Sequence, residues 1–280
     1  MRIIKALLAF LLFLGINYHL IAAEFYRKQT GTVTISNGST SNTAAILGVD
    51  RSKSFLVFST SLDDQSPTNY QIGGQITNTT TLSFIRTGNT GAVTIKWQVF
   101  EFESGVNVQH GSTTGVTRGA AMNVSINCVD LTKSFVLISA RKSGTQLGAD
   151  DGITANLTTS TNLALQISSN GPGGADMEEA YWQIIEYQAA TVKKVTATLA
   201  ATVASTTSTI SPAISNLAKA IVISNHGQDG DVNLDDLPRT ELTNTTTVTY
   251  TRVGTTAAIN FVTYVIEFSD ATTVTRGTQN

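Results

Sequence analysis

Apolar side chains recur at every second position over much of the chain, and this pattern predicts β-strands. Leu82 and Phe84 follow this period, as do Val248 and Tyr250 in a similar segment later in the chain. A period of two places alternate side chains on opposite faces of a sheet. Residues 54–57 are instead almost continuously apolar, as expected of a strand that is buried in the centre of a sheet. Since no stretch combines helical periodicity with capping residues, we expect an all-β fold.

The one long apolar run lies at the N-terminus and predicts a signal peptide over residues 1–23. Arg2 and Lys5 precede an apolar core at residues 6–16, and Ala22 and Ala23 belong to a small-residue cleavage site. The run is short for a membrane span, and an uncleaved anchor is the alternative. We therefore expect a secreted, extracellular or cell-surface protein, with the periplasm an open alternative, and no membrane span in the mature chain.

Three diverged copies of one unit follow the signal peptide. Each copy has a lysine-led apolar strand and ends in a strand that carries a glutamate, which is preceded in the first two copies by a tryptophan. These landmarks are Lys53, Lys133 and Lys219, then Trp97 and Trp182, and then Glu101, Glu186 and Glu267. We predict three tandem β-sandwich repeats of jelly-roll or immunoglobulin-like type, at residues 24–112, 113–198 and 199–280.

The residues that recur are expected to serve structure. The tryptophans are interpreted as packing anchors, with a stacking platform for sugars as the alternative. A lysine–glutamate pair across two strands would favour one strand register more than it would stabilise the fold. Asp50, Asp130 and Asn216 suit the first position of a tight turn before the lysine-led strand.

Composition argues against several functional classes. Charged residues make up 14% of the chain and the net charge is −2, which is not the basic footprint of a nucleic-acid-binding protein. The single cysteine, Cys128, cannot form an internal disulfide, and its apolar surroundings predict a buried thiol. A glycosidase needs two carboxylates that face one sugar, whereas each unit repeats only one glutamate. We therefore predict no catalytic residues, no cofactor and no enzymatic activity.

Acidic loops provide the only metal candidate. Each copy has a pair of adjacent aspartates in a variable loop, and the loop of the third copy alternates oxygen ligands as a calcium loop does. Leu234 stands where such a loop has its turn glycine, and Thr240 stands at its twelfth position. Solvated loop acids are the alternative to a calcium site. The candidate ligands are Asp229, Asp231, Asn233 and Asp235.

The combined motifs resemble those of a protein class of unassigned role. Lys-Ser-Phe-Val, Asn-x-Thr-Thr-x-Leu-x-Phe-x-Arg, Trp-Gln-Val-x-Glu-Phe and Val-Gln-x-Gly are similar to β-sandwich repeat units of phage tail-fibre-like and bacterial surface proteins. This resemblance implies structural or adhesive work outside the cell and no particular ligand. A carbohydrate-binding, lectin-like array, with or without calcium, is the alternative function.

A strand motif near two unit boundaries raises the question of self-assembly. Val-Thr-Arg-Gly occurs at residues 116–119 and again at residues 274–277. The terminal copy either completes the third sandwich or leaves an edge that pairs with another chain. Possible partners are therefore a second copy or a glycan or surface ligand.

Overall fold

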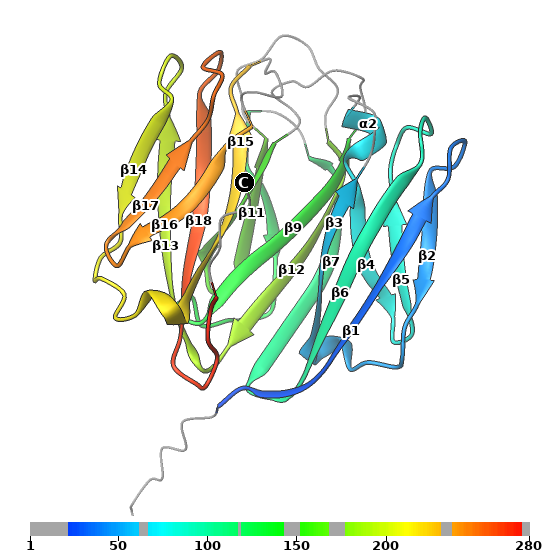
Figure 1. The fold of residues 1–280 in the computed structure, drawn as a ribbon, viewed down its shortest axis with the longest axis horizontal. Coiled ribbons are helices and arrows are strands. Elements are labelled where there is room, and N and C mark those ends of the chain that lie inside the picture. Colours follow the sequence, from blue (N-terminus) through cyan, green and yellow to red (C-terminus); the bar gives the residue numbers. More distant parts are fainter. Residues whose placement is uncertain are drawn as a thin grey trace, which may run out of the picture.

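The computed structural model describes residues 22–61, 67–116, 119–142, 152–167, 177–230 and 237–275, and these are nearly all β (Figure 1). The predicted signal peptide lies almost wholly outside the described residues. Among the described residues, no helix has the length and apolar character needed to cross a membrane.

Each of three consecutive units contributes six strands. The first contains β1 (Glu24–Ile35), β2 (Ser41–Ala45), the short helix η1 (Arg51–Lys53), β3 (Ser54–Ser61), α2 (Pro67–Tyr70), β4 (Gly73–Asn78), β5 (Thr81–Ile85) and β6 (Val93–Ser104). The second contains β7 (Val106–Val116), β8 (Met122–Ser125), β9 (Ser134–Lys142), β10 (Ile153–Thr159), β11 (Asn162–Ile167) and β12 (Met177–Tyr187). The third contains β13 (Ala190–Leu199), β14 (Ser205–Thr209), η2 (Leu217–Lys219), β15 (Ala220–Gln228), β16 (Arg239–Asn244), β17 (Thr247–Thr251) and β18 (Ile259–Phe268).

The strand order is the same in every unit. One antiparallel sheet joins the first, sixth and third strands, as β1–β6–β3, β7–β12–β9 and β13–β18–β15. The facing sheet joins the second, fifth and fourth strands, as β2–β5–β4, β8–β11–β10 and β14–β17–β16. Each unit is thus a small two-sheet sandwich, which confirms the predicted fold class. A single bridge between Ile153 and His226 joins sheets of the second and third units.

The pairing places the unit boundaries earlier than residues 112 and 198. β7 pairs with β12 and so belongs to the second unit, and β13 pairs with β18 of the third. The first boundary is Gly105, whose φ of +75° turns the chain directly from β6 into β7. The sequence prediction assigned these strands to the preceding unit because they follow its last strand without a loop.

Apolar residues form three buried clusters. The first unit has its own core around Ile76, Phe84 and Ile95, and the third has one around Tyr250 and Phe261. The largest cluster combines the core of the second unit with residues of β6 and β18 from its two neighbours. Burial therefore continues from one unit to the next, and the units are not separate domains on a string.

Candidate functional site

The recurring tryptophans are core residues. Trp97 and Trp182 are 7% and 8% exposed, and each indole lies over a glycine on the neighbouring strand, Gly31 and Gly111. A Cβ atom at either glycine would lie 2.3 Å or 2.1 Å from the indole Cζ2, so only glycine fits opposite the ring. The packing interpretation therefore holds, and the buried rings offer no open face to a sugar.

The third unit fills the same space differently. Thr263 replaces the tryptophan, and Val195 replaces the glycine opposite it. Tyr250 supplies the missing bulk, since its ring centroid lies 4.4 Å from that of Phe261 and its hydroxyl donates to Thr263 Oγ1 over 3.0 Å. The two positions have changed together, as expected of residues that share one packing site.

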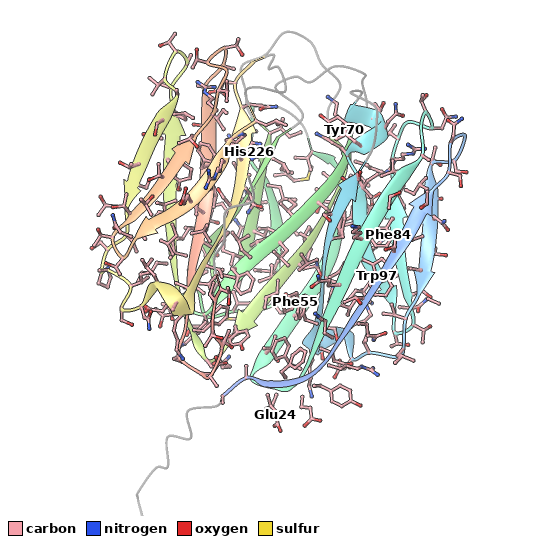
Figure 2. All side chains as sticks on the ribbon, in the orientation of Figure 1. Glu24, Phe55, Tyr70, Phe84, Trp97 and His226 are labelled. Carbon is pink, nitrogen blue, oxygen red and sulfur yellow. The ribbon has the colours of Figure 1, made fainter. Side chains whose placement is uncertain are left out.

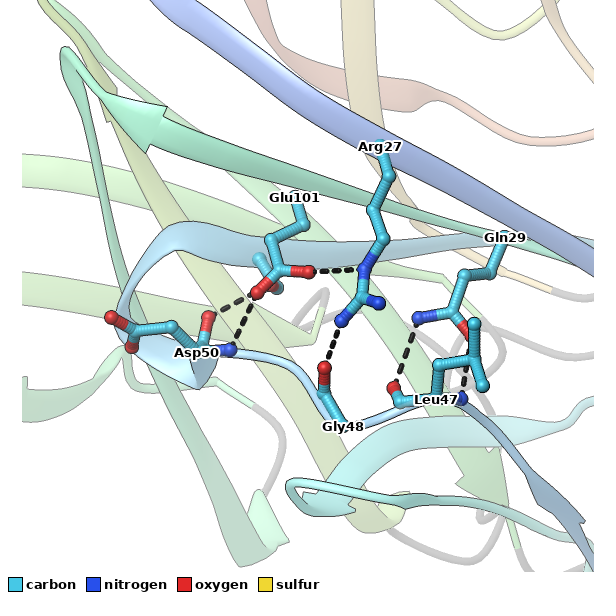
Figure 3. Close-up of polar contacts among 7 residues, drawn as sticks. Arg27, Gln29, Leu47, Gly48, Asp50 and Glu101 are labelled. Carbon is cyan, nitrogen blue, oxygen red and sulfur yellow. Dashed lines mark hydrogen bonds and ion pairs between the residues drawn. The ribbon is translucent and has the colours of Figure 1, made fainter.

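The recurring glutamates hold the turn before the lysine-led strand (Figure 3). Glu101 is 6% exposed and accepts hydrogen bonds from the Asp50 amide and from Arg27 Nε, each over 2.7 Å. Arg27 also donates through Nη2 to the Gly48 carbonyl. The Asp50 carboxylate accepts from the Ser52 amide over 2.9 Å, which confirms the predicted turn. Glu101 therefore anchors the start of β3 to the end of β6.

The other two units repeat this contact. Glu186 accepts from the Asp130 amide over 3.4 Å, and Glu267 accepts from the Asn216 amide over 2.9 Å and from Ser215. Burial alone would raise the pKa of Glu267, but the hydrogen bonds from Ser215 and Asn216 outweigh it, and the pKa is lowered. Each glutamate carboxylate thus accepts a hydrogen bond from the turn of its own unit.

The recurring lysines do not pair with these glutamates. Lys53, Lys133 and Lys219 each donate to a backbone carbonyl shortly after the recurring glutamate in the sequence, at Glu103, Ala190 and Asp270. Lysine and glutamate therefore tie the same corner of each sandwich through the backbone. The cross-strand ion pair considered from the sequence is replaced by two separate backbone contacts.

Buried arginines fix the opposite end of two units. Arg86 is 1% exposed and Arg252 is 6% exposed, and both donate to backbone carbonyls of the surrounding loops. In the second unit the equivalent residue is Ile167, which is fully buried and ends β11. The carbonyls that Arg86 reaches belong to Ser36, Ser39, Asn69, Thr90 and Gly91.

One polar position on the sixth strand joins neighbouring units. Gln183 of β12 accepts from the Leu56 amide over 2.8 Å and donates to the Leu56 carbonyl over 2.9 Å. The equivalent Tyr264 of β18 donates to the Ala155 carbonyl and accepts from the Leu157 amide, each over 3.0 Å. Both side chains cover the open edge of a strand in the preceding unit, where backbone groups need partners. The equivalent Gln98 of the first unit is exposed.

The third strands of the three units converge on a central pocket of about 380 Å³. β9 lies between β15 and β3 (Figure 1). The strand register shows that Val57, Leu137 and Ile223 are equivalent, because they pair with the equivalent residues Gln98, Gln183 and Tyr264. The next side chains on the same face of each strand lie two positions further on, so two triads of equivalent residues line the pocket. These triads are Val57, Leu137 and Ile223, and then Ser59, Ser139 and Asn225.

Aromatic rings fill the interface at one end of these strands. Phe102, Tyr187 and Phe268 are equivalent residues, and their neighbouring ring centroids lie 5.6 Å and 5.2 Å apart. Phe55 stacks on this group from β3, 6.1 Å from Phe102. Figure 2 shows Phe55 toward this end, with Tyr70 and His226 toward the other. The pocket therefore has a packed aromatic end and a more polar one.

No family model and no curated protein matches this chain. Its candidate site is therefore assigned from its own geometry.

Asn225 is the one polar side chain of the two triads that is buried and unpartnered. It is 8% exposed, and its Nδ2 has no hydrogen-bond partner among the described residues. Ser139 Oγ accepts from the Gly74 amide over 3.1 Å, and the neighbouring Ser224 bonds Thr263 over 2.8 Å. Asn225 thus brings unused hydrogen-bonding capacity to the pocket wall.

A second pocket of about 330 Å³ adjoins the first and shares Ile138, Ser139 and Asn225 with it. His226 lines it, and burial lowers the pKa of this histidine to about 4, so the ring is neutral at pH 7. In the described part of the chain, none of the side chains that line either pocket is an aspartate, glutamate, lysine or arginine. The lining of the two pockets that the structure describes is therefore neutral.

The calcium candidate falls mostly outside the described residues. Asp231, Asn233 and Asp235 lie there, as do the aspartate pairs of all three loops. Asp229 is described and accepts a hydrogen bond from Asn260 over 3.3 Å. Over the ranges that the structure describes, no group of three or more histidines, cysteines or acids could hold a metal ion.

Cys128 is exposed, so the predicted buried thiol is wrong. β8 ends at Ser125, and the chain then leaves the sheet before Val129, which is 5% exposed, re-enters the core. Cys128 lies in that connection and its side chain faces solvent. The apolar residues on either side of it had extended the predicted strand too far.

Proposed function

We propose that this chain is a secreted or cell-surface structural or adhesive β-repeat protein without enzymatic activity. The observation that carries the proposal is the work done by the recurring side chains. The repeated tryptophans, glutamates and lysines all pack or bond within the scaffold, and Gln183 and Tyr264 bond one unit to the next. A chain whose repeated side chains make the scaffold rigid is suited to display and attachment.

The positions of the acids support the absence of hydrolysis. A glycosidase mechanism uses two carboxyl groups on either side of one bond. Glu101, Glu186 and Glu267 occupy equivalent positions in three separate units, and each is held by the amide of its own turn. None of them lines the central pocket.

Carbohydrate binding is the second candidate function. The sequence indicates two sites for it, the tryptophans and the acidic loops, and the burial of both indoles removes the first of these sites. The central pocket favours it instead, because apolar and uncharged polar side chains face each other there.

Export is tested with residues 1–23 fused to a reporter enzyme that is active only outside the cytoplasm. We expect reporter activity from the native segment and its loss with Leu12→Arg in the apolar core. Attachment is tested by flow cytometry of fluorescent residues 24–280 on cells of the producing organism and its neighbours. Cytoplasmic retention of the reporter, or binding no greater than that of a labelled unrelated β-sandwich, would overturn the proposal.

A further inference from the structure

We infer that the central pocket binds one neutral sugar ring, with the Asn225 carboxamide as its principal hydrogen-bonding group. The inference rests on the second candidate function, carbohydrate binding at the central pocket, and makes it specific; it does not depend on the proposed structural role. A pocket of about 380 Å³ lies within the range of roughly 300–1,000 Å³ that is common for small-molecule sites.

The pocket is assembled from all three units. Each third strand contributes one aliphatic residue, Val57, Leu137 or Ile223, and Val57 is 42% exposed despite its position between units. Exposed aliphatic surface in a concave site favours a ligand that presents carbon–hydrogen groups to it. The pocket therefore requires an occupant with an apolar face.

The next residues on the same strands supply the polar half of the site. Ser59 is exposed, and Ser139 Oγ has only the Gly74 backbone as its partner. Asn225 is buried, and among the residues that the structure describes its Nδ2 has no hydrogen-bond partner. Because a buried amide without partners is costly, a ligand oxygen that accepts from it would gain more than one that meets an already satisfied group. The occupant therefore carries hydroxyl or carbonyl oxygens beside its apolar face.

The lack of charged side chains in the described lining narrows the class of ligand further. None of the described lining residues is ionised at pH 7, since His226 in the adjoining pocket is also neutral. An anionic or cationic ligand would lose its hydration without gaining a counter-charge. A pyranose combines carbon–hydrogen faces with a rim of hydroxyl groups and has no charge. It satisfies all three requirements of the pocket.

A difference between the units favours a single orientation of the sugar in the pocket. The position that is serine in the first two units is asparagine in the third, so one side of the pocket donates and accepts through an amide. Asn225 is thus the residue that we expect to determine which hydroxyl or acetamido group faces β15.

The probes are the neutral methyl glycosides of glucose, galactose, mannose and N-acetylglucosamine, with methyl glucuronide as the charged comparison. Saturation-transfer NMR and calorimetric titration are performed on residues 24–280. We expect at least one neutral glycoside to bind saturably and methyl glucuronide to bind at least 10-fold more weakly than methyl glucoside where the latter binds.

Two variants locate the binding in the pocket. Asn225→Ser introduces the residue of the other two units, which preserves the local fold, and we expect at least a 10-fold loss of affinity. Leu137→Trp fills the cavity and should abolish binding. The matched controls are Asn107→Ser on an exposed strand position and Val253→Trp at a residue that is 84% exposed, and both should change affinity by less than 2-fold.

No saturable binding by any neutral glycoside would overturn the inference, because the pocket then holds solvent only. Binding that survives both Asn225→Ser and Leu137→Trp with native circular dichroism would also overturn it, because the site then lies elsewhere. Neither result affects the export and attachment experiments, so the two proposals fail separately.

Discussion

Removal of one hydroxyl group at the interface between the second and third units should uncouple the unfolding of these two units. In Tyr264→Phe the ring stays in place, but the Ala155 carbonyl and the Leu157 amide lose a partner that lies 3.0 Å from each. Both belong to the open edge of β10, and Tyr264 is 1% exposed. A buried backbone group without a partner costs about 1–3 kcal/mol. Two such groups give about 2–4 kcal/mol, in the lower part of the summed range because the strand can relax.

The assay uses the uneven distribution of tryptophan. The chain has two tryptophans, Trp97 and Trp182, which lie in the first and second units, so their fluorescence does not report directly on the third. Far-ultraviolet circular dichroism reports on all three units. In guanidinium chloride we expect coincident transitions for the native chain, and an earlier transition by dichroism than by fluorescence for Tyr264→Phe.

The matched control makes the same substitution inside the third unit. Tyr250 donates to Thr263 over 3.0 Å and contacts no other unit through its hydroxyl, so Tyr250→Phe should cost about 1 kcal/mol. In this variant the transitions by dichroism and by fluorescence should lie closer together than in Tyr264→Phe. A Tyr264→Phe variant whose free energy of unfolding lies within about 0.5 kcal/mol of that of the native chain would refute the assignment of Tyr264 as an edge cap.

Three further predictions concern single side chains. Gly111→Val should cost about 1–3 kcal/mol because the new atoms meet the Trp182 ring, and a double-mutant cycle with Trp182→Thr should show compensation, whereas additive losses would contradict the shared packing site. Burial lowers the pKa of His226 to about 4, whereas the same imidazole in the unfolded chain has a pKa of about 6.5. Between about pH 7 and about pH 4.5 the unfolded chain therefore binds a proton that the folded chain does not, and the free energy of unfolding should fall by about 2.5 kcal/mol. Denaturant titrations at the two pH values should show this drop reduced in His226→Asn, and an equal drop in both proteins would exclude His226 as its source. Cys128 should react with a thiol reagent in native buffer nearly as fast as in denaturant, and slow native labelling would contradict its exposure.

Local sequence was sufficient to predict the strands and the turns between them. The Asp50, Asp130 and Asn216 side chains each accept from the amide two residues ahead, over 2.9, 2.8 and 2.8 Å, as their position before the lysine-led strand predicted. These contacts span only two residues, so the pattern that encodes them is complete within a short window. Period-two alternation is equally local, and it gave the correct fold class.

Sheet membership could not be predicted from the same evidence. β7 follows β6 after one glycine and ends at Val116, yet its partner β12 begins only at Met177. Nothing in its own sequence distinguishes a last strand of one sandwich from a first strand of the next. The exposure of Cys128 was missed for a related reason, because the end of β8 is set by where the second sheet stops pairing.

The central pocket could not be predicted from the repeats, because recurrence reveals only those positions at which the copies carry the same or a similar residue. Residues that perform the same task in each sandwich, such as Glu101 and its two equivalents, stand out by recurrence. The pocket instead arises where equivalent residues meet each other across units, and there the three copies have diverged.

This divergence has a physical cause in the arrangement of the units. A residue that acts inside one sandwich has equivalent neighbours in every copy, so one side chain can serve all three copies, as the recurring glutamates do. At the convergence of β3, β9 and β15, the three copies of one position share a single space, and three identical side chains would have to fill it from three directions. Asn225 against Ser59 and Ser139 is such a difference. In a single-chain repeat protein of this kind, specificity is therefore expected where the repeats meet and differ, and stability where they agree.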